Sequence, residues 1–237
     1  MTRGLLRWAE ANGETETWFA LVELGDERTT DLAKAEYDAA GHQPPFWQLP
    51  QRRKAYSTIV AEGMKRVCKD FSDRVASIGF KKSGRRLWTR LNDWTIESIA
   101  FHRSGSSYGG APINASVSIR VMIGVHVLND PTPGGSVGII SDHVRRKSGG
   151  AFHHRFNAET WSTYDRCVDE LMLFTSEFAE PWFTELRYPE NLIAHPDLRP
   201  STRKLLEEAV AGHSNPENVA TSLKALGVKV GGRKAKT

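Results

Sequence analysis

Ser107 stands in a sequence pattern that is typical of a catalytic nucleophile. The run GSSYG, residues 105–109, matches G-x-S-x-G, in which a strained turn between a strand and a helix exposes a serine hydroxyl. A strand is predicted before this run, but Gly110-Ala111-Pro112 and then a second long strand follow it. Because the pattern requires a helix at that point, we interpret the run as a loop between strands and keep Ser107 as a weaker candidate.

A second group of chemically capable residues is the basic run GFKKSGRR, residues 79–86. Glycine, lysine and serine occur together as in a phosphate loop, but such a loop precedes a helix, whereas this run follows a predicted one. Cations at the end of a helix are favourable without any ligand. The functional hypothesis that remains is a basic patch with an aromatic platform, which would bind nucleic acid or an acidic protein surface. The residues predicted for this patch are Lys81, Lys82, Arg85, Arg86, Trp88 and Arg90.

The chain has eight histidines, and one local cluster combines His143, His153 and His154 with Asp142. Adjacent residues on a strand point to opposite faces, so His153 and His154 cannot both bind one metal without an irregular backbone. HExxH and CxxC spacings are absent from the sequence. We therefore predict no metal site and no cofactor.

His102 and His126 are the other histidines that could take part in a site. They are predicted to lie on neighbouring strands and to meet across the sheet, where a hydrogen-bonded structural role is favoured over a catalytic one. No pair of carboxylates has the spacing and direction expected for acid–base work. His102 and His126 therefore stay weaker candidates, and the chain is not predicted to be an enzyme.

The elements that must position these residues follow from apolar spacing. Apolar residues three and four apart predict a helix over 53–78, which Gly79 ends in a left-handed conformation while Phe80 folds back onto the last turn. A second long helix is predicted over 160–187, capped by Asn157 or Thr160 and kinked or split at Pro181. Alternating apolar and polar residues predict strands at 86–91, 94–102 and 113–127, with shorter ones at 137–140 and 151–156. Strict alternation favours an antiparallel sheet.

We therefore predict an α+β fold, with an antiparallel sheet of about four or five strands packed against the two long helices and followed by a C-terminal helical hairpin. The hairpin helices are predicted at 201–211 and 216–226. The predicted domains are an acidic N-terminal extension at 1–50, an α+β core at 51–195, the helical hairpin at 196–228 and a basic disordered tail at 229–237.

Charge is spread unevenly along the chain, whose net charge is +4. Residues 1–50 hold 4 Lys/Arg against 9 Asp/Glu, which is −5, and residues 51–90 hold 12 against 3, which is +9. The basic segment could steer an acidic partner to itself, or the acidic extension could cover the chain's own basic face; the sequence leaves both alternatives open.

Composition narrows the class of protein. No apolar run approaches the roughly 18–20 residues needed to cross a bilayer, and Glu10 and Glu14 stand where a signal peptide needs apolar or small residues. We therefore expect a cytoplasmic protein with no membrane partner. The two cysteines, Cys68 and Cys167, each lie in a predicted helix, so buried thiols are favoured over a disulfide.

Roughly residues 55–190 resemble an uncharacterised bacterial domain family, number 4304 among the domains of unknown function. The resemblance lies in the order of four segments: a helix, GFKKSGRRLWTR, WTIESIAFHRS and INASVSIRVMIGVHV. The family pattern has glutamine where this chain has His102, which puts a polar role at that position in doubt. The resemblance supports the fold and implies a bacterial source, but it brings no established activity. The matching positions are Gly79, Phe80, Lys81, Lys82, Gly84, Trp88, Arg90, Ile99, Phe101, Ser104, Ile119, Val121, Ile123, Gly124 and Val125.

Two functional hypotheses follow, and they belong to different classes. The first is a non-catalytic bacterial interaction protein with an unidentified protein partner, in a toxin–immunity or phage-defence setting. The alternative is a nucleic-acid-binding protein that uses the basic turn at 81–90. A third and weaker hypothesis is an enzyme that uses Ser107.

Overall fold

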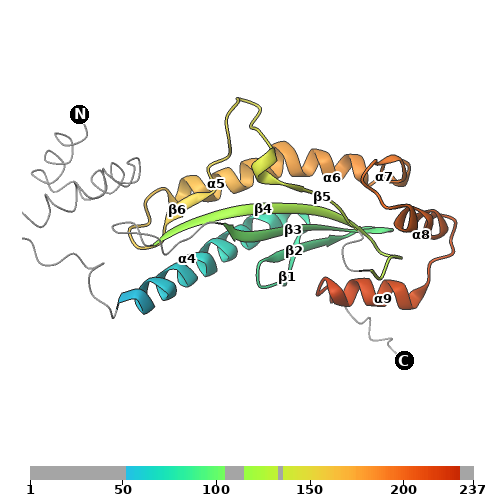
Figure 1. The fold of residues 1–237 in the computed structure, drawn as a ribbon, viewed down its shortest axis with the longest axis horizontal. Coiled ribbons are helices and arrows are strands. Elements are labelled where there is room, and N and C mark those ends of the chain that lie inside the picture. The colour runs from blue at the N-terminus through green and yellow to red at the C-terminus, as the bar shows by residue number, and fades with distance from the viewer. Residues whose placement is uncertain (1–51, 105–114, 133–135, 230–237) are drawn as a thin grey trace, which may run out of the picture. The chain divides into compact units, whose positions relative to one another are not determined.

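The computed structural model describes residues 52–104, 115–132 and 136–229 of the chain, and Figure 1 labels their helices and strands. The first of two compact units comprises the described residues of Met1–Val67, Ser104–Ser118 and Arg155–Cys167. The second comprises those of Cys68–Arg103, Ile119–His154 and Val168–Thr237. The acidic extension at 1–50, Ser107 and nearly all of the predicted tail lie outside the described residues, and the predicted domain boundaries stay predictions.

An antiparallel sheet confirms the predicted α+β class. Its strands are β1 Lys81–Gly84, β2 Leu87–Leu91, β3 Thr95–Ser104, β4 Ser116–Val127, β5 Ser136–Ile140 and β6 Arg155–Asn157. They run in the order β1-β2-β3-β4-β5, and β6 pairs with β4. The sheet has six strands, where about four or five were predicted, and the strand expected at 151–156 is reduced to β6.

Strand β1 corrects the interpretation of residues 81–86 as a turn. Lys81 pairs with Thr89 and Lys82 with Trp88 in antiparallel register, so only Arg85 and Arg86 form the reversal to β2. In the described sheet β1 is the terminal strand, and its lysines are exposed. An edge strand buries little side-chain surface, and so its sequence carries no apolar alternation that could have revealed it.

The first long helix was predicted correctly. Helix α4 spans Arg52–Val75 and continues as a 3₁₀ turn, Ala76–Ile78. Gly79 follows with φ 90°, its N–H donates to the carbonyl of Ala76, and Phe80 N–H donates to the carbonyl of Val75. Phe80 is buried, as expected for a side chain that folds back onto the last turn.

The second long helix begins later than predicted. Helix α5 spans Tyr164–Phe174, because Trp161 and Thr163 have φ values of 61° and 60°, which no right-handed helix can contain. The Asn157 side chain accepts hydrogen bonds from the N–H groups of Glu159 and Thr160, and so it caps a turn that precedes the helix.

The helical run is divided just before Pro181, where a kink or a split was predicted. A π-helical turn, Thr175–Ala179, follows α5, and helix α6 spans Glu180–Leu186 with Pro181 in its first turn. A π turn widens the helix, and this one ends two residues before Pro181, which lacks a backbone N–H.

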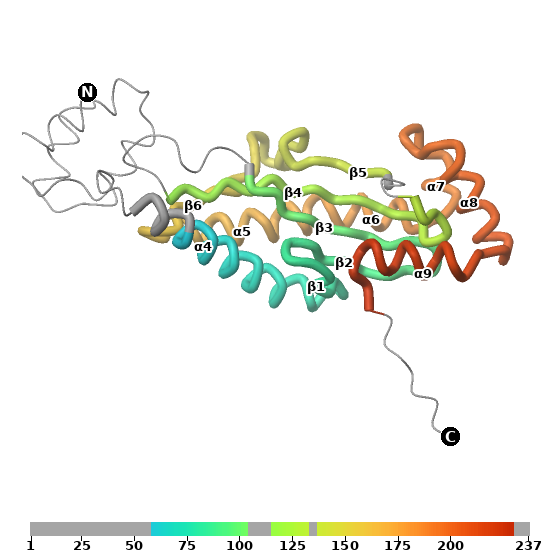
Figure 2. The backbone as a smooth tube through the Cα atoms, turned by 60° about the horizontal axis from the view of Figure 1, so that its bottom comes forward, coloured from blue at the N-terminus to red at the C-terminus, as the bar shows by residue number. Residues whose placement is uncertain are grey.

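Both helices of the predicted C-terminal hairpin are present, with one more helix before them. They are α8 Pro200–Val210 and α9 Pro216–Ala225, and the additional helix is α7 Pro189–Ala194. The side chain of Asn215 accepts a hydrogen bond from Glu217 N–H and caps α9. Figure 2 shows α9 next to the β1–β2 hairpin.

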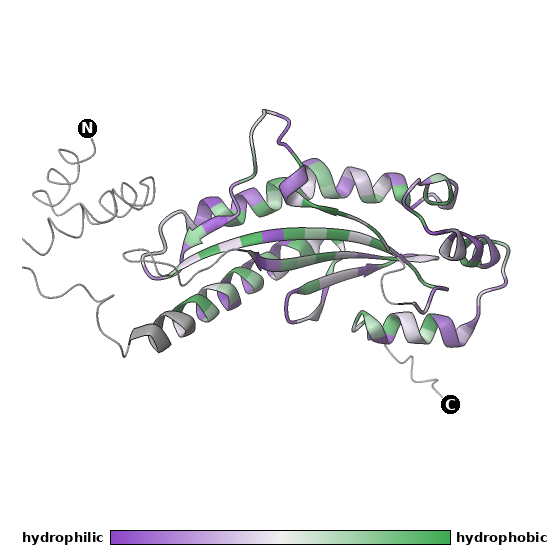
Figure 3. Ribbon diagram, in the orientation of Figure 1, coloured by the Kyte–Doolittle hydropathy of each residue, from purple (hydrophilic) through white to green (hydrophobic). Residues whose placement is uncertain are grey.

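Helices cover one face of the sheet in the second unit. Trp88 pairs with Ile99 across β2 and β3, and Phe101 shares their face because side chains two residues apart on a strand point the same way. The ring of Phe71, on α4, lies 4.8 Å from that of Trp88 and 4.6 Å from that of Phe101. Alternating apolar bands along β4 are visible in Figure 3.

The first unit has its own packing centre, around β6 and the segment that follows it. Gly63 of α4 lies so close to Phe156 and Ala158 that a Cβ at this position would collide with Ala158. The guanidinium of Arg66 lies 4.4 Å from the ring centroid of Trp161 and 4.7 Å from that of Tyr164.

Among the described residues, no helix is both long and apolar enough to span a bilayer.

Candidate functional site

A pocket of about 710 Å³ lies in the second unit, between the β1–β2 hairpin and the residues after α9. The lining comes from the end of α4, from both strands of the hairpin and from the segment that leaves α9. The lining residues are Gly79, Lys81, Lys82, Ser83, Gly84, Thr89, Arg90, Leu91, Gly227, Val228 and Lys229. This volume falls within the range of about 300–1,000 Å³ that is usual for small-molecule sites.

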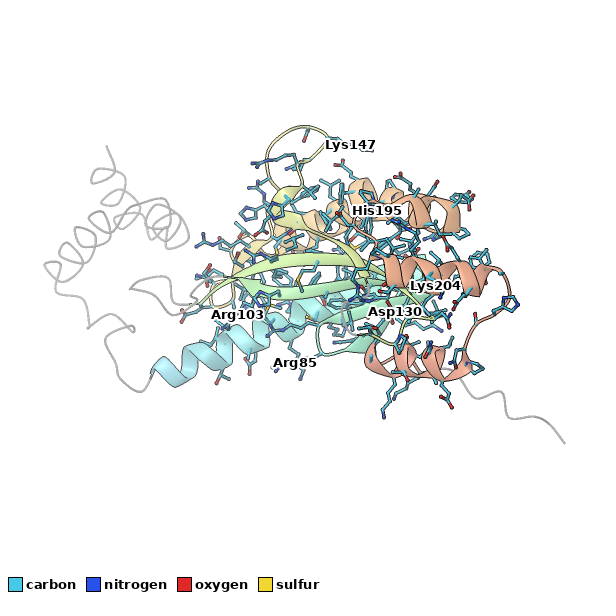
Figure 4. The ribbon with its side chains drawn as sticks, turned by 45° about the vertical axis from the view of Figure 1, so that its right-hand side comes forward. Arg85, Arg103, Asp130, Lys147, His195 and Lys204 are labelled. Atoms are coloured by element: carbon cyan, nitrogen blue, oxygen red, sulfur yellow. The ribbon has the colours of Figure 1, made fainter. Side chains whose placement is uncertain are left out.

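Four cations of the predicted patch lie on the β1–β2 hairpin, and two of them, Lys81 and Lys82, line the pocket. Lys81, Lys82 and Arg85 are exposed, and Arg86 is half-buried. Figure 4 shows Arg85 at the hairpin. Within 52–104, 115–132 and 136–229, no carboxylate forms an ion pair with any of these four cations. Within the described part of the chain, their charge is therefore not neutralised by an ion pair.

Trp88 cannot provide the aromatic platform that the sequence suggested. Its side chain is fully buried, its indole N–H donates a hydrogen bond of 2.7 Å to Ser72 Oγ, and its ring packs against Phe71 and Phe101. Alternation along β2 places Trp88 on the helix-covered face, which is why an aromatic residue stands there.

Arg90 is not an open member of the patch either. Its Nε donates to Glu97 Oε2 at 2.5 Å, and its other nitrogens donate to Glu180 and to the carbonyl of Ile78. The guanidinium also lies 4.3 Å from the ring centroid of Phe80. Arg90 lines the pocket, but its donors are already used within the protein.

Glu97 is the centre of this ion-pair network, and sequence reasoning missed it. Its side chain is 1% exposed, and Arg187 Nε donates to Glu97 Oε1 at 2.7 Å. The hydrogen bond from Arg187 to Glu97 raises the pKa of that arginine. The available signal was strand alternation, which puts Glu97 on the same face as the buried Ile99 and Phe101.

Two hydroxyl groups and a glycine contact complete the pocket. Ser83 Oγ is buried and has no hydrogen-bond partner among the described residues, and Thr89 is 5% exposed. Gly227 has φ 64° and passes so close to β1 that a Cβ would collide with the carbonyl oxygen of Ser83. Only glycine allows the segment after α9 to approach the strand this closely.

The two weaker histidine candidates do not meet. His126 Nε2 lies 3.1 Å from Ser98 Oγ, which also donates to the carbonyl of Gly124, and burial lowers the pKa of His126. His102 is exposed and lies four residues beyond Ser98 on β3, about 13 Å along the strand at 3.3 Å per residue. The expectation that they meet across the sheet is therefore wrong, because His126 lies beside Ser98 and the residues after it lead toward Trp94, whose carbonyl accepts from Leu128 N–H, away from His102.

Asp142 and His154, two members of the predicted histidine cluster, have structural partners. Asp142 pairs with Arg120 at 2.7 Å, and burial lowers the pKa of His154 to about 4 while its Nε2 lies 3.3 Å from the carbonyl of Glu170. Burial raises the pKa of the Cys68 thiol despite the nearby Lys82. No group of three His, Cys, Asp or Glu side chains in the described part of the chain is arranged to hold a metal ion.

Comparison with known proteins adds no assignment to this geometry. No family model matches the chain, and neither a curated protein nor a solved structure shows significant similarity to it. The fold and the site define an α+β protein with a cationic pocket at the edge of its sheet.

Proposed function

We propose that this chain is a non-catalytic binding protein that uses the β1–β2 hairpin to bind an acidic protein partner. The observation that carries the proposal is the set of exposed cations Lys81, Lys82 and Arg85, which have no carboxylate partner in the described residues. Opposite charges across an interface steer association and fix its orientation.

The burial of Trp88 supports an acidic protein surface over single-stranded nucleic acid. Nucleic-acid binding of that kind combines cations with aromatic rings on which bases stack, and this ring is enclosed in the core. Acidic protein surfaces need no such ring, because exposed ammonium and guanidinium groups suffice for charge pairing.

Duplex nucleic acid is the second candidate, and one observation favours it. Lys229 lies at the same pocket as Lys81 and Lys82, and the sequence after it continues with Arg233, Lys234 and Lys236. Phosphate backbones are bound mainly by such lysine and arginine side chains, without base stacking. Membership of family 4304, the bacterial source and the toxin–immunity or phage-defence setting remain predictions.

A charge-reversal experiment tests the proposal. The full chain would be measured by biolayer interferometry against a 20-residue polyglutamate and a 20-base-pair DNA duplex at 50 and 200 mM salt. We expect polyglutamate to bind at 50 mM salt, to weaken at 200 mM salt, and to be lost in the variant Lys81→Glu/Lys82→Glu/Arg85→Glu.

The matched control is Lys204→Glu, which reverses another exposed lysine of the second unit and should leave binding unchanged. Tighter binding of the duplex, with the same loss in the triple variant, would favour the second candidate. Absence of binding to both probes at 50 mM salt would contradict the whole proposal.

A further inference from the structure

We propose that the pocket between the β1–β2 hairpin and residues 227–229 binds a phosphate ester of about nucleotide size. The inference rests on the basic surface of the proposed function and adds a ligand that neither the hairpin sequence nor the partner hypothesis specifies.

The first argument is the convergence of positive charge from two distant parts of the chain. Lys81 and Lys82 come from β1, and Lys229 comes from the segment after α9, yet all three line one pocket. A phosphate monoester carries a charge of about −1.5 to −2 at pH 7 and three strong acceptor oxygens, so it needs several donors at once. Lys81 and Lys82 are adjacent on β1 and point to opposite faces, so the two cations that can act together on one ligand are one of these lysines and Lys229 from the other wall.

The second argument is a donor without a partner at the same place. Ser83 Oγ is buried at the pocket and makes no hydrogen bond within the described residues, although a buried hydroxyl group is normally paired. The hydroxyl is enclosed in this structure, and rotation about the Cα–Cβ bond of Ser83 would bring it to the pocket, where a phosphate oxygen would accept its hydrogen bond. Ser83 lies at the β-bulge between Lys82 and Gly84, where the register of β1 against β2 shifts, and Ser83 lines the same pocket as Lys81.

The third argument is that glycines form much of the wall. Gly79, Gly84 and Gly227 line the pocket, and Gly79 and Gly227 both have positive φ. A Cβ at these three positions would meet atoms of Arg90, Leu87 and Ser83, so the glycines let the protein's own segments pack closely and shape the wall of the pocket. The pocket therefore combines cations with a buried hydroxyl that has no partner among the described residues.

The size and the apolar lining indicate more than a bare phosphate. A volume of about 710 Å³ is much larger than one ion, and Leu91 is 50% exposed beside it, with Val228 on the opposite segment. These apolar side chains can contact the organic part of an ester. The same chemistry is offered by a free nucleotide, by a phosphorylated side chain of a partner and by a terminal phosphate of a nucleic acid.

Calorimetry on the full chain at 50 mM salt tests the inference. The probes are adenosine monophosphate, adenosine, inorganic phosphate and O-phosphoserine. We expect adenosine monophosphate to bind and adenosine to show no measurable binding. Inorganic phosphate should bind at least about tenfold more weakly than the nucleotide, because phosphate alone makes no contacts through an organic part. Equal affinity of phosphoserine and the nucleotide would identify a phosphorylated protein as the source, and a clear preference for the nucleotide would exclude it.

Three variants connect the binding to the pocket. Ser83→Ala should weaken nucleotide binding about tenfold or more, because it removes a hydrogen bond to a charged group, and Lys229→Ala should weaken it about two- to fivefold. Gly227→Ala should also weaken it, because the new Cβ moves the wall away from Ser83. Lys204→Ala is the control and should change nothing.

The outcomes separate this inference from the proposed function. If adenosine and its monophosphate bind equally, or if Ser83→Ala and Lys229→Ala both leave nucleotide affinity unchanged, the phosphate pocket is refuted. If the nucleotide does not bind while polyglutamate still does, the inference fails and the acidic-partner proposal stands. If neither binds, both fail.

Discussion

Replacing Glu97 by leucine tests whether the buried ion-pair network determines the stability of the second unit. Glu97 is 1% exposed and is contacted by Arg90 at 2.5 Å and Arg187 at 2.7 Å. Removal of one partner from a buried ion pair costs about 3–5 kcal/mol, mostly because the remaining charge is left buried and unpaired.

The structure indicates the lower end of that range. After Glu97→Leu, Arg90 still has Glu180 at 2.9 Å, and the side chain of Arg187 is 34% exposed, so it can reach water. We therefore expect the free energy of unfolding to fall by about 3 kcal/mol. With a urea m-value of about 2 kcal/mol per M, the unfolding midpoint would move down by about 1.5 M.

Urea unfolding followed by circular dichroism measures this change. Glu208→Leu is the matched control, since Glu208 faces Lys204 at 3.9 Å in an exposed pair, and such pairs contribute about 0–1 kcal/mol. A double-mutant cycle of Glu97→Leu with Arg187→Met should show a cost smaller than the sum of the single changes. A loss below about 1 kcal/mol in Glu97→Leu would refute the reasoning that the network is a buried, interdependent set.

Two further predictions concern buried polar groups. Asp130 has a buried carboxylate that accepts from Thr202 Oγ1 at 2.6 Å and from Thr132 N–H at 2.9 Å, and Figure 4 shows it beside α8. Asp130→Ala should destabilise the fold by about 2 kcal/mol and speed amide hydrogen exchange in α8; unchanged exchange would contradict this anchoring role. His154 has a folded-state pKa of about 4 against an ordinary 6.5, so the unfolded chain takes up the proton first as pH falls. The free energy of unfolding should therefore be highest above pH 6.5 and should fall by about 3 kcal/mol in total toward pH 4. The variant His154→Gln should flatten this pH dependence. An unflattened profile in that variant would assign the effect to other groups.

The fold was largely predictable because its main elements have strong periodic signals. The helix at 53–78, its end at Gly79 and the alternation of the strand that became β4 follow from burial of one face, which the residue pattern records directly. The start of α5 was not predictable, because the left-handed conformations of Trp161 and Thr163 depend on local packing and not on residue type. Strand β1 was not predicted because its lysines are exposed and its four residues show no apolar alternation.

The site was predictable only in part, because residue type does not report which groups are already paired. Lys81, Lys82 and Arg85 are exposed as expected. The sequence placed Trp88 and Arg90 in the same patch. In the structure, helices pack on that face of the sheet, so Trp88 is buried and Arg90 forms an ion pair with Glu97.

By itself, the sequence determined the helices, the long strands, the antiparallel class and the basic character of residues 81–86, since each depends on the local spacing of residue types. Only the tertiary structure decided that Lys229 joins Lys81 at one pocket, that Ser83 has a buried hydroxyl beside them, and that Glu97 holds two arginines. These features depend on contacts between segments that are far apart in the chain, and no local pattern records which distant segments meet.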